Sequence, residues 1–242
     1  MIGSFFHTII YAPLYNALVF LINIMPGGDV GLAVVVLTII VRFILYPLSR
    51  NAIKTQIVMK KLVPEVEKIK EKNKDNKEEE ARAILALYKE HNVSPFAGIG
   101  LMLLQLPILI GLYWVFARGG WPHIDASMLY SFVHAPEHIN MLFLGFIDIS
   151  AKHNIVLAVL AAVTQAIYTR LSMGPKGEKT ATEASFSNDL ARSFDIQARY
   201  VLPAIIGVIS YTITAAAPLY WVTGNIFMIA QEYLSGRRFH GK

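Results

Sequence analysis

The chain contains no cysteine and little charge. Only 16% of its 242 residues are Asp, Glu, Lys or Arg, whereas soluble domains carry about 25%. Without cysteine the chain has no disulfide, no cysteine–zinc site, no thiol catalysis and no lipid anchor on a cysteine. The motifs H-E-x-x-H and G-x-S-x-G are absent, and no phosphate-binding glycine loop is present. We therefore expect a protein that is not an enzyme and that uses no metal or other cofactor.

Hydrophobic residues are abundant and arranged in long runs. They make up 55% of the chain, and apolar stretches of about 18 or more residues recur, as expected for membrane-spanning helices. This pattern predicts an all-α polytopic membrane protein. Its expected core has five transmembrane helices, at residues 31–48, 95–117, 155–173, 200–216 and 218–234. The last two, which together cover residues 200–234, are short for a hydrocarbon core of about 30 Å.

The N-terminal segment, residues 1–25, has no Lys or Arg and does not fit a signal peptide. His7, Tyr11 and Tyr15 repeat at intervals of four along one helical face, while apolar residues mark another. This pattern is typical of an amphipathic helix that lies in the membrane interface. A short spanning helix is the alternative interpretation, and residue pattern alone does not decide between them.

A charged segment at residues 49–94 follows the first predicted span. It holds eleven Lys or Arg and eight Asp or Glu residues, together with two apolar stripes of helical spacing. Residues 73–76 read as a turn, and Asn76 is positioned to cap a second helix with acidic residues 78–80 in its first turn. We expect a helical hairpin in water, with its two stripes facing each other. The alternative is a solvated linker.

The distribution of basic residues predicts the orientation. Nineteen of the 22 Lys and Arg residues lie in three segments, which are residues 49–94, 170–199 and 237–242. By the positive-inside rule, the hairpin, the loop at 174–198 and the tail at 235–242 are cytoplasmic. The loop at 118–153 has two basic residues and is expected outside. The net charge of +5 thus follows the membrane and gives no sign of nucleic-acid specificity.

Arg42 is a charge placed well inside the first predicted span. A charge at the centre of a bilayer is unfavourable by about 2.5–3.5 kcal/mol on insertion scales, which makes it a functional-site hypothesis. Arg42 lies eight residues before Arg50, or about 12 Å along a helix. Snorkelling of the side chain to the headgroups is the alternative. We expect instead that the guanidinium lies in a hydrated or polar cavity within the protein.

The other polar residues of the predicted spans are uncharged. They include Thr38, Gln105, Gln165, Thr212 and Asn225. Each alone is explained by an interhelical hydrogen bond worth about 0.6 kcal/mol, but together with Arg42 they favour a shared polar cavity. The spans are expected to hold no buried Asp or Glu, with Glu232 near the cytoplasmic end of the last. Ion-coupled transport normally needs such a group, so it is disfavoured.

Several stretches resemble the YidC/Oxa/Alb family of membrane protein insertases over residues 5–235. They are LTIIVRFILYPLS (37–49), KKLVPEVEKIKEK (60–72), LYKEHNVSPFAGIGLMLLQLPILIGLYWVF (87–116), VTQAIYTRLSM (163–173) and LYWVTGNIFMIAQEYL (219–234). The resemblance implies a five-helix core with a cytoplasmic hairpin, and it favours an interfacial N-terminal helix. It also implies a hydrophilic groove that opens to cytoplasm and lipid and is closed on the outer side.

The same resemblance implies roles for particular residues. Arg42 matches the groove arginine, and Thr38, Gln165 and Trp221 match positions of groove or substrate-contact residues; Gln105 is a further candidate. By this resemblance we expect neither the large outer domain of some members nor the basic C-terminal extension with which others bind ribosomes. The short tail therefore argues against tight ribosome binding.

The expected function is insertion and folding of newly made membrane proteins, without ATP. The groove shortens the dry path for a polar tail, Arg42 attracts acidic residues in that tail, and burial of the apolar segment in lipid drives the step. Expected partners are nascent membrane proteins, the lipid bilayer, the ribosome and a Sec translocon, at the cell (plasma or inner) membrane. The alternatives are a small-solute transporter or channel with a cation-lined half-pore, and a chaperone that only shields helices.

Overall fold

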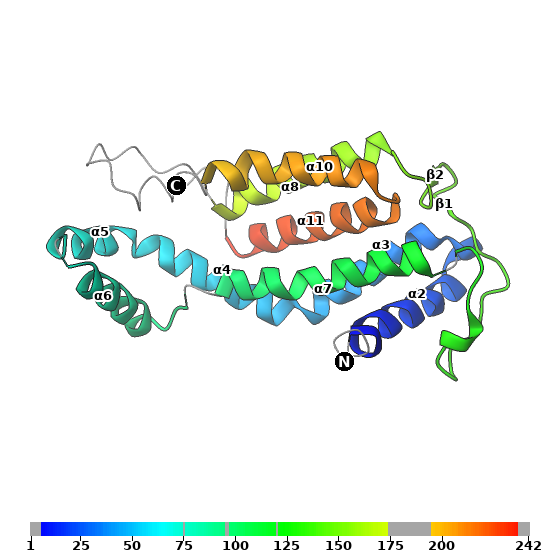
Figure 1. Cartoon of the computed structure of the whole chain (residues 1–242), viewed down its shortest axis with the longest axis horizontal. Helices are drawn as coiled ribbons and strands as arrows, with labels where there is room; N and C mark the ends of the chain where they lie inside the picture. Colours follow the sequence, from blue (N-terminus) through cyan, green and yellow to red (C-terminus); the bar gives the residue numbers. More distant parts are fainter. Residues whose placement is uncertain (1–5, 75, 95–96, 120, 174–194, 237–242) are drawn as a thin grey trace. The chain divides into compact units, whose positions relative to one another are not determined.

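A computed structural model describes residues 6–74, 76–94, 97–119, 121–173 and 195–236 of the chain (Figure 1). In one helix, the side chains of residues 97–105 and 118 lie outside this description. The chain is mostly helical and divides into two compact units. The bundle unit comprises residues 1–44 and 107–242, and the charged unit comprises residues 45–106.

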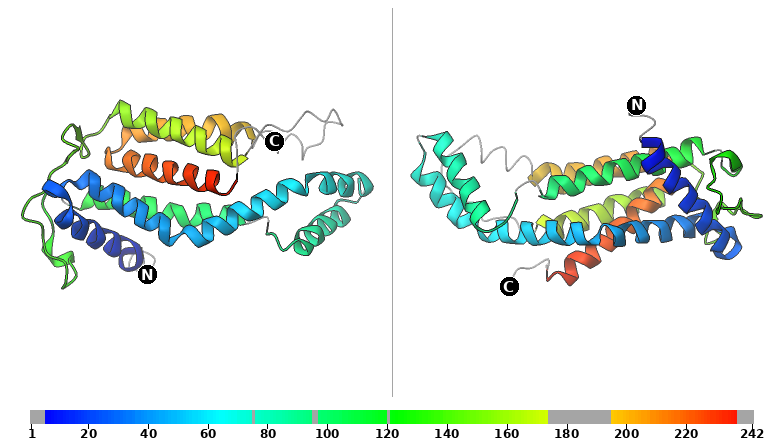
Figure 2. Two further views of the ribbon diagram at one scale, coloured as in Figure 1. Left: turned by 180° about the vertical axis from the view of Figure 1, so that it is seen from behind. Right: turned by 90° about the horizontal axis from the view of Figure 1, so that it is seen from below.

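The bundle unit is built from apolar helices. They are the π-helical turn η1 (His7–Tyr11), α2 (Ala12–Ile24), the 3-10 turn η2 (Pro26–Gly28), α3 (Val30–Ile44), the part of α7 (Ala97–Arg118) from Pro107 onward, α8 (Ile155–Met173), η4 (Gln197–Val201), α10 (Leu202–Thr212) and α11 (Ala216–Leu234). Helix α11 packs against both α8 and α3, α10 packs against α8, and α2 packs against α3 (Figures 1 and 2).

The main hydrophobic core lies where α2, α3 and the second half of α7 meet. Tyr15 and Leu18 of α2 are fully buried there. Helix α7 comes close to η1 and α2 at Gly111, where a Cβ would lie 2.7 Å from Ile10 Cγ2 of η1 and 2.9 Å from Leu14 Cδ1 of α2. The N-terminal helix is therefore an integral part of the bundle unit.

The segment between α7 and α8 folds over α2. It contains the short turn η3 (Ala126–Met128). The Asn16 side chain donates to Met128 O at 3.0 Å and accepts from Tyr130 N at 2.7 Å. Further along the same helix, Asn23 Nδ2 donates to His134 O at 2.7 Å. Side-chain amides of α2 thus supply hydrogen bonds that this irregular backbone needs.

Residues 140–153, which we call the clasp, join one end of several helices. The clasp includes an antiparallel pair of two-residue strands, β1 (Leu142–Phe143) and β2 (Ile147–Asp148), a feature that the all-α prediction did not include. Its backbone hydrogen bonds are Val30 N to Asn140 O (3.0 Å), Ala216 N to Ile149 O (3.0 Å), Ala215 N to Ala151 O (2.9 Å) and His153 N to Tyr211 O (3.0 Å). The clasp therefore ties the start of α3 to the α10–α11 turn, immediately before α8 begins.

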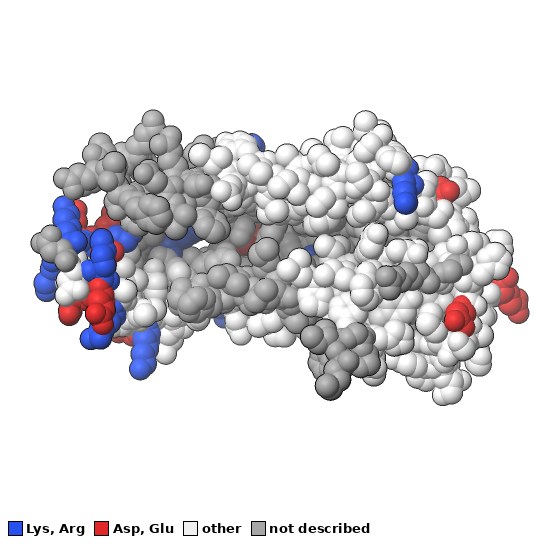
Figure 3. All heavy atoms as spheres, viewed as in Figure 1, with Lys and Arg blue, Asp and Glu red and all other residues white. Residues whose placement is uncertain are grey.

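The charged unit contains three helices and the first part of α7. These helices are α4 (Tyr46–Lys61), α5 (Val63–Lys72) and α6 (Lys77–Glu90), and α5 packs against α6. The apolar stripe expected to form one helix is interrupted at Leu62, because Pro64 lies in the first turn of α5, where its missing N–H is tolerated. In Figure 3, Lys, Arg, Asp and Glu side chains gather over α5 and α6, whereas the visible bundle surface carries few.

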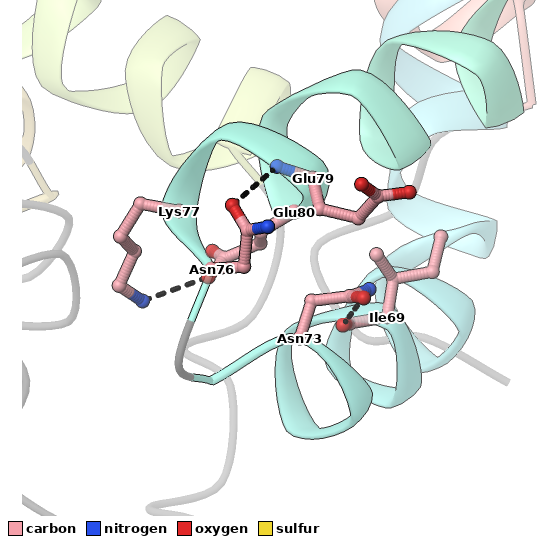
Figure 4. Close-up of polar contacts among 6 residues, drawn as sticks. All are labelled: Ile69, Asn73, Asn76, Lys77, Glu79 and Glu80. Carbon is pink, nitrogen blue, oxygen red and sulfur yellow. Dashed lines mark hydrogen bonds and ion pairs between the residues drawn. The ribbon is translucent and has the colours of Figure 1, made fainter.

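The turn between α5 and α6 has the predicted cap. Asn76 Oδ1 accepts a hydrogen bond from Glu79 N at 3.1 Å, and residues 78–80 place three carboxylates in the first turn of α6 (Figure 4). Asn73 Nδ2 donates to Ile69 O at 2.9 Å, which satisfies a carbonyl at the end of α5. The cap predicted from the sequence at Asn76 is therefore confirmed.

The first predicted span, residues 31–48, is divided between two helices. Helix α3 ends at Ile44, Leu45 separates the helices, and Pro47 lies in the first turn of α4. A proline here removes one intrahelical hydrogen bond and clashes with the carbonyl four residues earlier, which ends the preceding helix. The apolar part of this region is thus a helix of 15 residues.

By length and composition, two of the described helices can cross a membrane, His7–Ile24 and Ile155–Met173. Val30–Ile44 and Tyr46–Lys61 pass the same test only as a pair, and Leu106–Ala117 is a shorter apolar helix. The described residues therefore contain several membrane-compatible helices, while the count of five spans stays a prediction.

Candidate functional site

Arg42 lies in the last turn of α3 and is buried. Only 9% of the residue is exposed, which is unusual for a charged side chain. The carbonyl end of a helix carries partial negative charge, so this position favours a cation. Beside it, Phe43 makes an edge-to-face contact with Phe227 of α11, with the ring centroids 5.2 Å apart. The end of α3 is thus held against α11.

The guanidinium of Arg42 lies directly against Gly224 of α11. A Cβ at position 224 would be 2.5 Å from Nη2 and 3.1 Å from Nε of Arg42, so glycine lets the guanidinium lie here without moving. Nε is buried and has no hydrogen-bond partner. Among the described residues, no carboxylate forms an ion pair with Arg42. The structure therefore places the buried guanidinium of Arg42 beside the backbone of Gly224, and at least its Nε–H has no acceptor.

Thr38 lies one helical turn before Arg42 on the same face of α3. The residue is 1% exposed, and its hydroxyl donates to Val34 O at 2.7 Å. Its proton is therefore used by its own helix, while the oxygen keeps acceptor capacity.

Helices α8 and α11 also carry buried polar side chains. Asn225, directly after Gly224, is buried, and its Nδ2 donates to Thr164 Oγ1 of α8 at 3.3 Å. Gln165, also buried, donates from Nε2 to Thr169 Oγ1 at 3.2 Å. Consecutive residues of α11 therefore meet the cation of α3 and a hydroxyl of α8.

Trp221 is half-buried one turn before Asn225 and packs against Ala161, Ile206 and Val222. It contributes an aromatic surface between α8, α10 and α11. Gln105 belongs to α7, but its side chain lies outside the described residues. The structure thus brings Arg42 of α3 against Gly224 of α11 and Asn225 of α11 against Thr164 of α8, while Thr38 and Gln165 are buried on α3 and α8.

Two residues of α11 were missed or misjudged from the sequence. Glu232 is 0% exposed, so the prediction that the spans hold no buried carboxylate is wrong. Glu232 lies near the end of α11, but the packing of the neighbouring helices covers it. The absence of a buried carboxylate therefore no longer argues against ion-coupled transport. Gly224 was not predicted, although an isolated glycine in an apolar helix is a recognised sign of close approach.

Comparison with known proteins identifies the family. A family model described as "60Kd inner membrane protein" matches residues 21–242. "Membrane protein insertase YidC" of Clostridium tetani is 32% identical over 87% of this chain and 83% of its own length. The protein of the same name from Fusobacterium nucleatum is 32% identical over 93% and 95%. "Membrane protein insertase MisCA" of Bacillus subtilis is 29% identical over 87% and 71%. The chain therefore belongs to the 60Kd inner membrane protein family, the YidC/Oxa/Alb family that its motifs resemble.

Proposed function

We propose that this chain is a membrane protein insertase and that Arg42 is the group that draws substrate into the protein. Family membership supports the function, and the relatives described above carry that name. The observation that carries the role of Arg42 is its buried guanidinium, which faces Gly224 and finds no carboxylate among the described residues.

A buried cation without an acceptor is unfavourable, and the deficit is removed by a partner that brings negative charge. An acidic residue in the polar tail of an incoming helix is such a partner. The attraction is strong because the surroundings have low dielectric. Once the tail is released to the far side, the substrate's apolar segment is stabilised by lipid, so the step needs no nucleotide.

We assign the groove to the faces of α3, α8 and α11 that carry the polar residues. Helix α3 contributes the guanidinium of Arg42 and the hydroxyl of Thr38 to the groove, and α8 contributes the amide of Gln165. Trp221 gives the apolar substrate segment an aromatic surface. Gln105 of α7 is proposed as a further groove residue from the sequence alone. The hydrogen bonds Gln165–Thr169 and Asn225–Thr164 support a polar strip between α8 and α11.

We further propose a five-span topology with the charged unit and the C-terminus in the cytoplasm. The bias of Lys and Arg supports this orientation. On this topology the clasp lies outside, where its hydrogen bonds to α3 and to the α10–α11 turn support an outer side that is closed. The charged unit would meet the nascent chain first, delivered by a ribosome or a Sec-type channel.

In this topology η1 and α2 lie in the outer interface, although their combined length, His7–Ile24, would allow a span. Asn16 in the middle of this segment and Asn23 near its end bind the irregular backbone around Met128 and His134. Irregular backbone is not found in contact with the lipid hydrocarbon. A helix bordered by such a loop along its length is therefore better placed at the membrane surface.

The test compares Arg42→Ala and Arg42→Lys in vesicles that receive a single-span substrate with an acidic tail. We expect Arg42→Ala to lose most insertion and Arg42→Lys to keep part of it, because Lys retains the charge but not the planar fork. Normal insertion by both variants would refute the role of Arg42. Crosslinking from positions 165 and 221 to a ribosome-bound chain distinguishes insertion from shielding on outer helix surfaces.

The competing function is a small-solute transporter with a cation-lined half-pore, for which buried Glu232 is the one favourable observation. It predicts anion flux across sealed vesicles that contain only this protein. An insertase with a closed outer side predicts no such flux.

A further inference from the structure

The tip of the β1–β2 hairpin exposes apolar side chains although it lies outside every predicted span. Leu144 is 55% exposed and Phe146 is 71% exposed, and Leu142 beside them is 45% exposed. No charged residue occurs from residue 141 to residue 147. A contiguous apolar group on a loop in water is unfavourable and usually marks an interaction site.

The tip is held in place by the bundle unit. Phe143, on the opposite face of the hairpin, contacts Gly31 in the first turn of α3 so closely that a Cβ there would clash with its ring. The N–H of Leu144 donates to Asp29 Oδ2 at 2.9 Å. Gly145 has a φ of +84°, which makes the sharp reversal possible. The exposed face of the hairpin therefore points away from the core by construction.

The helices next to the hairpin indicate that lipid is the partner of its exposed apolar side chains. The clasp leads directly into α8, whose first residues Ile155 and Val156 are 66% and 58% exposed. Helix α8 has the length and composition of a membrane span, so these residues begin a lipid-facing surface. Phe143 ties the hairpin to the first turn of α3, which is also where an apolar helix begins. The tip thus lies in the chain between the starts of α3 and α8, two apolar helices, although exposed Asp148 and Lys152 separate it from α8 in sequence.

We propose that the tip, Leu144–Phe146, inserts into the lipid at the boundary between headgroups and acyl chains. Aromatic and aliphatic side chains without charge suit this boundary. The clasp would then fix the depth of α3 and α8 in the bilayer, because both helices are attached to it. This inference rests on the chain being a membrane protein and holds for either orientation and with or without insertase activity.

The experiment uses the absence of native cysteine. Phe146→Cys carries a spin label, in nanodiscs where both faces are accessible, and its exposure to oxygen and to a water-soluble nickel complex is measured. Ala135→Cys, which is exposed in the same loop, is the aqueous control, and Val159→Cys on α8 is the lipid control. We expect the oxygen-to-nickel ratio at position 146 to lie several-fold above that at 135, towards that at 159.

Two outcomes would overturn the proposal. A ratio at position 146 equal to that at position 135 would place the tip in water. Exclusion of both reagents would mean that protein, such as a second copy of this chain, covers it. Leu142→Cys gives an independent reading from the same face. Insertion by the Phe146→Cys protein is measured separately, so failure of the lipid contact is distinct from failure of the proposed function.

Discussion

At the scale of single residues, the contact between Arg42 and Gly224 places a buried charge against a glycine. A buried charge normally has a partner, because its desolvation is unfavourable by several kcal/mol. Arg42 has instead a glycine backbone beside it and a buried Nε with no acceptor. Its burial is predictable from an arginine within an apolar run, whereas the approach of Gly224 depends on how α3 and α11 pack.

The first prediction concerns Gly224→Ala. The added Cβ would lie 2.5 Å from Arg42 Nη2 and 3.1 Å from Nε, so the guanidinium must shift from its position against α11. We expect a several-fold loss of insertion for substrates with acidic tails, measured in vesicles. Gly207→Ala is the matched control, because it crowds Ala162 at 3.1 Å between α10 and α8, away from Arg42. Equal loss in both variants would mean that general packing, and not the position of Arg42, limits insertion.

The second prediction concerns pH and Asp125. The Asp125 carboxylate accepts hydrogen bonds from the hydroxyl and from the N–H of Ser127. Both lower the pKa of Asp125 from its usual value, and the hydroxyl has the larger effect. Because this pKa is lower in the folded chain, the turn gains stability above the unfolded pKa and loses it as pH falls through the folded pKa. In an NMR titration, Ser127→Ala should raise the pKa of Asp125, and Ser127→Thr should leave it low. An unchanged pKa in Ser127→Ala would contradict the assignment.

At the scale of elements, local signals were predictable and long-range ones were not. The cap at Asn76 follows from residue type and spacing alone. The break before Pro64 was not predicted, although the missing N–H of the proline is a local signal for it. The hydrogen bonds from Asn16 to the loop and the complete burial of Glu232 depend on segments far apart in the sequence. The sequence therefore predicts where helices lie better than it predicts which of their polar groups are covered.

The third prediction concerns Asp29, which anchors the clasp. Its Oδ1 accepts from Leu32 N at 3.0 Å and its Oδ2 from Leu144 N at 2.9 Å, so it caps α3 and holds the hairpin. Loss of a cap costs about 0.5–2 kcal/mol. Asp29→Ala should therefore speed hydrogen exchange at the amides of Leu32 and Leu144.

The control for that prediction is Asp148→Ala. Asp148 is exposed and accepts hydrogen bonds only locally, from Ser150. Faster exchange should therefore stay near Ser150 in this variant. Unchanged exchange at Leu144 in Asp29→Ala would show that the clasp is held by other contacts.

At the scale of the whole molecule, the chain is a mostly helical membrane protein of the 60Kd inner membrane protein family. Its positive charge is unevenly distributed along the sequence, because nineteen of the 22 Lys and Arg residues lie in three segments. This asymmetry predicts orientation because basic segments stay on the cytoplasmic side. The family was recognisable from five motifs, whereas the number of spans follows from helix length only in part, since α3 and α10 are short.

The fourth prediction tests this orientation with single cysteines. Glu71→Cys lies on α5 in the charged unit, and Ala135→Cys lies in the loop before α8; both positions are exposed. In intact spheroplasts, a membrane-impermeant thiol reagent should label position 135 and spare position 71 until the membrane is opened. Labelling of position 71 from outside would reverse the proposed topology.

The role of Arg42 is tested most sharply by coupling the charge at position 42 to the charge of the substrate tail. Insertion of two single-span substrates, identical except for an acidic or a neutral tail, is measured with the native protein and with Arg42→Ala in a double-mutant cycle. We predict that removing Arg42 reduces insertion of the acidic-tail substrate far more than insertion of the neutral one. An equal reduction for both tails, or none for either, would contradict the proposal that Arg42 acts by attracting acidic residues.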